Sequence, residues 1–179
     1  MCIRDSYGGE EIKSTNLILV RQGEDPVIAA DDLLFPNGTV ITPDDRTLIV
    51  GETYAARLTA FDKNEDGSLS NRRVWADLTE GIEEGTAPLP DGICLDQEGA
   101  IWVASPSTAE VIRVHEGGKI TDRIPVATNA YACMLGGEDM KTLFICTSYA
   151  SGVDPEAALI EKSGKIEVTE VEVPGCGKP

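Results

Sequence analysis

The chain has 179 residues, of which 41% are apolar and 26% are charged, which is ordinary for a folded domain. It carries 15 Lys and Arg residues against 31 Asp and Glu residues, so the formal net charge is -16. Such a field repels phosphate backbones and anionic lipids, which argues against nucleic acid and membrane partners, and it draws cations to the surface. No apolar run approaches the roughly 18 residues that a membrane-spanning helix requires.

Short apolar strands separated by turns are expected along the whole chain. Residues 1–6 fit no element and are set aside as a non-native scar segment, which leaves residues 7–179 as one unit. We expect an incomplete first group of strands at 17–21 and 26–30, a second group at 37–78, a third at 90–126 and a fourth at 129–173. The acidic stretch 80–90, which is rich in Gly and Pro, predicts an exposed loop between the second and third groups.

Two of these groups begin in the same way. An Asx-Gly pair, Asn37-Gly38 or Asp91-Gly92, leads into a short apolar strand; an acidic turn, a second apolar strand, a small polar loop and an Arg-bearing strand follow. A weaker third copy starts at Ala132, so that the copies lie 54 and 41 residues apart. Repeats of roughly 40–50 residues with short strands are typical of β-propeller blades. A β-sandwich does not predict an Asx residue at the same place in successive units.

The repeated Asx residues are the first candidate for a functional site. In a propeller the innermost strand of each blade faces the central channel, so Asn37 and Asp91 are expected to converge there although they are far apart in sequence. Amide and carboxylate oxygens are hard ligands suited to Ca²⁺, Mg²⁺ or Mn²⁺. The residues alone leave an alternative open: both are simple turn residues, and the following Gly supplies a positive φ angle.

Other motifs favour structural roles. The segment 62–73 imitates an EF-hand calcium loop, but Arg73 stands where a bidentate Glu is required, so we predict a hairpin turning at Asp66-Gly67. The lone His115 excludes a zinc cluster and imidazole-dependent triads within this chain. Five cysteines without CxxC spacing indicate no disulfide framework, and we expect Cys94 and Cys146 to be buried. Trp75 and Trp102 are expected to pack between blades, and Arg57 and Arg113 to bond to neighbouring blades.

The chain resembles the senescence-marker-protein-30/gluconolactonase family of regucalcin-like lactonases. The matching stretches occur in order over about residues 15–175 and are 34–38 (LFPNG), 43–44 (PD), 48–53 (LIVGET), 60–62 (AFD), 66–74 (DGSLSNRRV), 90–96 (PDGICLD), 99–104 (GAIWVA) and 133–139 (CMLGGED). The resemblance implies an all-β, six-bladed β-propeller, of which this chain is an incomplete propeller of about four blades at the C-terminal end. It also implies one divalent ion in the central channel, held by Asn37, by Asp91 and by a Glu from an early blade that this chain lacks.

The activity implied by the resemblance is the hydrolysis of sugar lactones such as gluconolactone. Asp91 is the expected catalytic residue, Asn37 and Asp91 are the expected metal ligands, and the cofactor is a divalent ion (Ca²⁺, Zn²⁺, Mg²⁺ or Mn²⁺). The expected partner is a small-molecule lactone, and we expect a cytoplasmic protein. Two alternatives remain: a non-catalytic propeller that binds calcium or sugar, and a related hydrolase of other esters.

Overall fold

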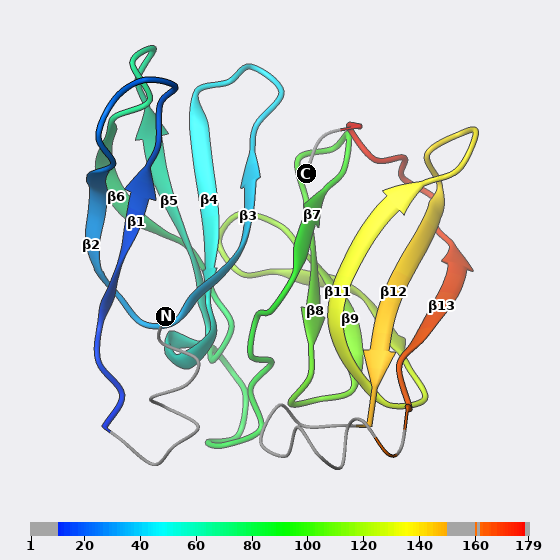
Figure 1. Ribbon diagram of the computed structural model, residues 1–179. Coiled ribbons are helices and arrows are strands. Elements are labelled where there is room, and N and C mark those ends of the chain that lie inside the picture. Colours follow the sequence, from blue (N-terminus) through cyan, green and yellow to red (C-terminus); the bar gives the residue numbers. More distant parts are fainter. Residues whose placement is uncertain (1–10, 150–159, 161, 178–179) are drawn as a thin grey trace.

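The computed structural model describes residues 11–149, 160 and 162–177. In this part of the chain the strands form four antiparallel sheets that stand side by side in an arc (Figure 1). The first sheet holds β1 (Thr15–Leu19) and β2 (Val27–Leu33). The second holds β3 (Pro36–Ile41), β4 (Thr47–Glu52), β5 (Arg57–Lys63) and β6 (Leu69–Asp77). The third holds β7 (Ile93–Leu95), β8 (Ile101–Ser105), β9 (Glu110–Val114) and β10 (Ile120–Pro125), and the fourth holds β11 (Asn129–Gly136), β12 (Thr142–Ser148) and β13 (Lys165–Glu170).

The sheets follow one another like the blades of a partial propeller, which confirms the predicted fold class and the predicted strand groups. Strand β3 contacts β7, and β7 contacts β11, so these three first strands are the inner strands of their sheets. They run in the same direction in Figure 1. A single 3-10 turn, η1 (Thr53–Ala55), joins β4 to β5, and no helix among the described residues is long and apolar enough to cross a bilayer.

The third sheet is buried on both faces, and its sequence shows why. Successive side chains of a strand point to opposite faces, so the continuous apolar run of β8 supplies both. Ile101 and Val103 pack into the core between the second and third sheets, where Trp75 also lies. Trp102 and Ala104 pack into the core between the third and fourth sheets. Each large apolar side chain buried in this way contributes about 1.5–3 kcal/mol to stability. The prediction that Trp75 and Trp102 pack between blades is confirmed.

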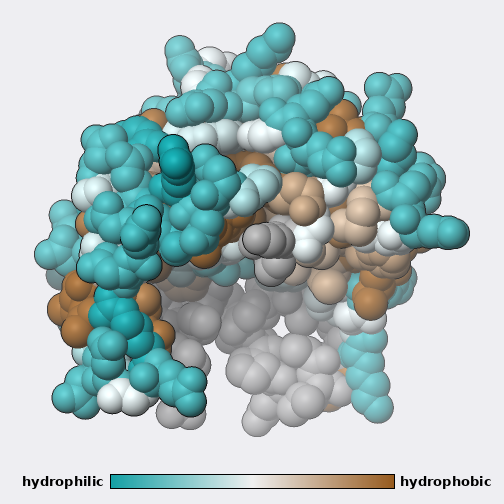
Figure 2. All heavy atoms as spheres, turned by 90° about the horizontal axis from the view of Figure 1, so that it is seen from above, coloured by the Kyte–Doolittle hydropathy of each residue, from teal (hydrophilic) through white to brown (hydrophobic). Residues whose placement is uncertain are grey.

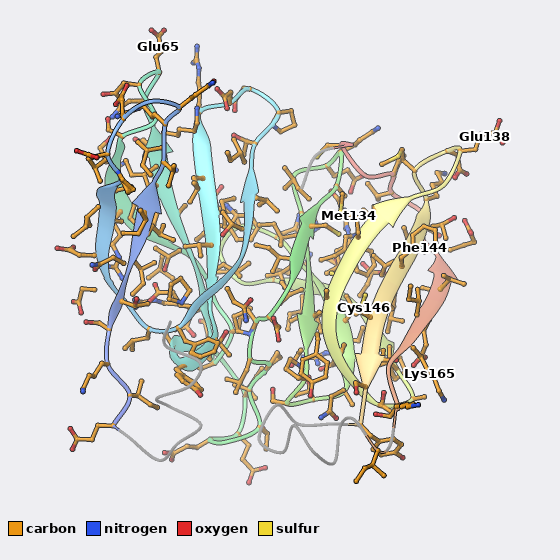
Figure 3. All side chains as sticks on the ribbon, in the orientation of Figure 1. Glu65, Met134, Glu138, Phe144, Cys146 and Lys165 are labelled. Carbon is orange, nitrogen blue, oxygen red and sulfur yellow. The ribbon has the colours of Figure 1, made fainter. Side chains whose placement is uncertain are left out.

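The two ends of the arc leave apolar faces uncovered. On the first sheet, the cross-strand pair Ile18 and Ile28 is 53% and 61% exposed. On the fourth sheet, Phe144 pairs with Val168 and Cys146 pairs with Ile166, and all four side chains are exposed. Figure 2 looks down on the arc and shows apolar surface on both of its limbs, and Figure 3 labels Phe144 and Cys146 on β12. We call these two surfaces the first and last end faces.

Three details of the fold bear on the sequence predictions. Residues 64–68 form the turn between β5 and β6, with Gly67 at a φ of 80°, so the hairpin prediction is confirmed. The expectation that Cys146 is buried is wrong, because it lies on the last end face; Cys94 is buried as expected. The expectation that Arg57 and Arg113 bond to neighbouring blades is also wrong. Arg57 pairs with Glu52 and Arg113 pairs with Asp96, each within its own sheet.

Candidate functional site

An irregularity in each inner strand positions the candidate residues. In β3, Pro36 pairs with Glu52 but Thr39 pairs with Val50, so one extra residue is inserted around Asn37. Before β7, the Asp91 N–H donates to the Ala104 carbonyl, and the Ala104 N–H donates to the Gly92 carbonyl, so residues 91 and 92 together face one partner. Such bulges bend a strand and re-aim the side chain of the extra residue, and they are enriched beside active sites.

Direct backbone hydrogen bonds then join the inner strands of neighbouring sheets. The Gly38 N–H donates to the Asp91 carbonyl over 3.0 Å, and the Gly92 N–H donates to the Tyr131 carbonyl over 2.9 Å. The same bond is made twice, from the residue after an Asx to the next inner strand. Residues 37, 91 and 131 therefore occupy the same position in three successive units of the fold. The third copy of the repeat aligns on Tyr131, one residue before the predicted Ala132.

The glycines are required for this close approach. A Cβ atom on Gly38 would lie 2.4 Å from the Asp91 carbonyl oxygen, and one on Gly92 would lie 2.7 Å from the Ala132 Cα. Neither glycine has a positive φ angle, unlike Gly67 or Gly99. The alternative reading of the Asx-Gly pairs as turns with a left-handed glycine is thus wrong. The glycines are there because two backbones meet.

The structure brings the side chains of Asn37 and Asp91 into contact. The Asn37 amide donates a hydrogen bond to the Asp91 carboxylate. Burial raises the pKa of Asp91 to about 6, and the hydrogen bond from Asn37 opposes this only in part. Among the described residues no Lys or Arg forms an ion pair with Asp91. Asp91 is thus a desolvated carboxylate without a counter-charge, and a bound cation would favour its charged form.

The donor set matches a hard cation in kind. One carboxylate and one amide oxygen are ligands that Ca²⁺, Mg²⁺ and Mn²⁺ accept, whereas Zn²⁺ sites use mainly Cys and His. In the part of the chain described by the structure, no group of three or more His, Cys, Asp or Glu side chains is placed to hold a metal. Asn37 and Asp91 by themselves do not make a complete ligand set.

A buried carboxylate next to the site escaped the sequence reasoning. Glu52, at the end of β4, is fully buried and accepts hydrogen bonds from the Leu34 N–H over 2.8 Å, from the Thr59 hydroxyl and from Arg57. Burial by itself would raise the pKa of Glu52, but these hydrogen bonds outweigh it and hold the pKa below its usual value. Glu52 thereby fixes the approach of the chain to Asn37. A charged residue separated from the apolar run 48–50 only by Gly51 was the available signal.

A cavity with a volume of about 540 Å³ lies elsewhere. It opens between the third and fourth sheets and is lined by Glu98, Asp122 and Glu170 together with Arg113. Neither Asn37 nor Asp91 lines it. Arg113 is already paired with Asp96 and Glu98, so this cavity has the character of a solvated, acidic gap between diverging sheets.

The sequence profile of the SMP-30/Gluconolactonase/LRE-like region matches residues 2–149. A 6-deoxy-6-sulfogluconolactonase from Pseudomonas putida is 29% identical over 98% of this chain and 57% of its own. The structure of a calcium-binding protein, regucalcin, from Agrobacterium tumefaciens superposes with a TM-score of 0.73 at 23% identity, over 92% of this chain and 55% of that one.

A gluconolactonase structure from Xanthomonas campestris superposes with a TM-score of 0.60 at 30% identity, over 77% of this chain and 43% of that one. The chain thus spans about half the length of the relatives it matches.

Proposed function

The chain belongs to the SMP-30/gluconolactonase/LRE-like family, and we propose on that premise that the whole protein is a divalent-metal-dependent hydrolase that opens sugar lactones. The observation that carries the proposal is the contact between Asn37 and Asp91, which come from the inner strands of different sheets. Relatives named as gluconolactonase and 6-deoxy-6-sulfogluconolactonase support the substrate class.

In this proposal Asn37 and Asp91 would hold the ion through their side-chain oxygens, together with further ligands besides these two residues. When bound, the ion polarises the lactone carbonyl and lowers the pKa of a water molecule. Asp91 would also accept a proton from that water at a carboxylate oxygen. Asn37 keeps its amide oxygen toward the ion and remains neutral throughout.

The decisive experiment replaces the carboxylate of Asp91 by an amide in the full-length protein. Asp91→Asn keeps the size of the side chain but removes its charge and its basicity. We expect loss of lactone hydrolysis by more than about 100-fold, since even the outer partners of a metal ligand affect affinity or activity by roughly 10- to 100-fold. The assay is turnover of a panel of aldonolactones, measured with and without a chelator and after readdition of Ca²⁺, Zn²⁺, Mg²⁺ or Mn²⁺.

Asp45→Asn is the matched control, because Asp45 is 68% exposed and pairs only with Lys63 at the surface. Its activity should equal that of the unchanged protein. Near-native turnover by Asp91→Asn would remove Asp91 from the mechanism, and hydrolysis that survives the chelator would exclude the metal. Metal binding without turnover of any lactone would favour the second candidate, a calcium- or sugar-binding propeller, which the similarity to a calcium-binding regucalcin supports.

A further inference from the structure

The backbone geometry that aligns Asn37 with Asp91 extends to a third inner strand. Gly38 donates to residue 91 of the next inner strand, and Gly92 donates to residue 131 of the one after it. Tyr131 therefore occupies on β11 the position that Asn37 occupies on β3 and that Asp91 occupies before β7. No sequence motif marks this residue, because the third copy has Ala132 in place of the glycine.

The third strand is also irregular at the same point. Ala130 pairs with Thr147 and Ala132 pairs with Cys146, so Tyr131 is the one extra residue in the register of β11 against β12. The insertion changes which residues share a face. Ala130 and Cys133 are both buried in the core between the third and fourth sheets, three positions apart instead of two. The bulge interrupts the usual alternation of buried and exposed residues at Tyr131. The Tyr131 side chain is only half-buried.

The phenol of Tyr131 has a polar neighbour on its own strand. Its hydroxyl oxygen lies 3.5 Å from the Asn129 side-chain nitrogen, at the long limit of a hydrogen bond. A tyrosine offers an apolar ring together with a hydroxyl that both donates and accepts, which suits the ring face and the hydroxyl groups of a sugar.

We infer that Tyr131 is the third inward-facing side chain of the Asn37–Asp91 site, and that its hydroxyl holds a hydroxyl group of the bound sugar lactone. This inference rests on the proposed function, because it assigns a contact to the same site. Tyr131 is a positioning residue in this scheme. The metal ligands and the proton acceptor remain Asn37 and Asp91, so a change at Tyr131 should affect substrate affinity and leave metal affinity unchanged.

The test uses the full-length protein with Tyr131→Phe, which removes the hydroxyl and keeps the ring. We expect KM for the best lactone to rise about tenfold, as the loss of one hydrogen bond predicts, while kcat changes by less than about threefold. The dissociation constant of gluconolactam, a stable amide analogue of the lactone, should rise by a similar factor in isothermal titration. The affinity for Mn²⁺ should stay within about twofold, whereas Asp91→Asn should lose it.

Tyr149→Phe makes the same chemical change at a residue that is 70% exposed beyond the end of β12, and it should alter none of these quantities. Unchanged KM and lactam affinity in Tyr131→Phe, in an otherwise active protein, would overturn the inference and leave the proposed function intact. The unchanged protein could hydrolyse no lactone and still bind the lactam. Weaker lactam binding by Tyr131→Phe would then support the sugar contact of Tyr131, while the proposed hydrolase activity would be overturned. If it binds no lactam either, both are overturned.

Discussion

At the scale of single residues, Glu52 is a buried carboxylate that four neighbouring groups hold in place. It is fully buried, yet it is charged, because Arg57 and Arg72 lie beside it at 2.9 and 3.4 Å and Thr59 and the Leu34 amide donate to it. Breaking such a buried pair leaves charged groups without their partner and costs far more than breaking a surface pair. Glu52 also holds the segment that leads to Asn37, so its loss should be felt at the site.

Glu52→Gln should therefore lower the free energy of unfolding by about 3 kcal/mol at pH 7. Its effect should depend on pH in a defined direction. The folded-state pKa of Glu52 is lowered, so its stabilising contribution is full above the ordinary pKa and is lost as the pH falls through the folded value. The difference between the two proteins should shrink when urea midpoints are compared at pH 7 and at pH 3.5.

The control for this prediction is Glu24→Gln, since Glu24 is 58% exposed and pairs with Arg21 at the surface. That change should cost less than about 0.5 kcal/mol at either pH. A cost for Glu52→Gln that matches the control would show that the buried pair contributes little.

At the scale of elements, the contact between inner strands couples stability to the site. A methyl group on Gly38 would meet two backbone atoms, the Asp91 carbonyl oxygen at 2.4 Å and the Ile93 nitrogen at 2.6 Å. Backbone atoms cannot turn aside as a flexible side chain does, so β3 and β7 would have to separate. That separation would also pull Asn37 away from Asp91.

Gly38→Ala should thus destabilise the full-length protein by about 1–3 kcal/mol, as overpacking does, and weaken Mn²⁺ binding by at least about tenfold. Thermal melts and isothermal titration measure the two effects. Gly164→Ala is the matched control, because nothing lies within 4 Å of a Cβ at Gly164. Normal metal affinity in Gly38→Ala would show that the ligands do not depend on the contact between the strands.

At the scale of the whole molecule, the two end faces dominate the behaviour of the 179-residue chain on its own. The middle strands β4, β5, β8 and β9 of the two inner sheets are mostly buried, whereas Ile166 and Val168 on the last end face are 69% and 60% exposed. Uncovered apolar sheet faces and unpaired edges promote association. The net charge of -16 opposes association but is spread over the whole surface.

We expect the isolated chain to associate in a concentration-dependent way, as sedimentation velocity would detect. Replacing Ile166 and Val168 together by Lys should shift it strongly toward monomer. Val74→Lys, which removes an exposed apolar residue of β6 that belongs to neither end face, should have little effect. A clean monomer with a sharp cooperative melt from the unchanged chain would contradict this prediction.

Much of the fold follows from local patterns. The alternation of apolar residues, the turn residues at Asp66-Gly67 and the spacing of the Asx-Gly pairs predict the strand groups within a few residues, because these signals depend on neighbours along the chain. The same spacing predicts that Asn37 and Asp91 lie close together, since equivalent residues of radial repeats face a common axis. What these signals could not supply is which backbone hydrogen bonds join the strands of different sheets.

The sequence by itself thus determined an all-β arc of four sheets and the approach of two side chains, Asn37 and Asp91, at its inner strands. Only the tertiary structure decided that Gly38 and Gly92 serve a close approach of backbones, that Arg57 and Arg113 stay within their own sheets, and that Tyr131 is the third equivalent residue. The physical reason is that a bulge shifts the register by one residue without a local signal. Its position is fixed by hydrogen bonds to a strand about 40 residues away in the chain, which neither propensity nor periodicity encodes.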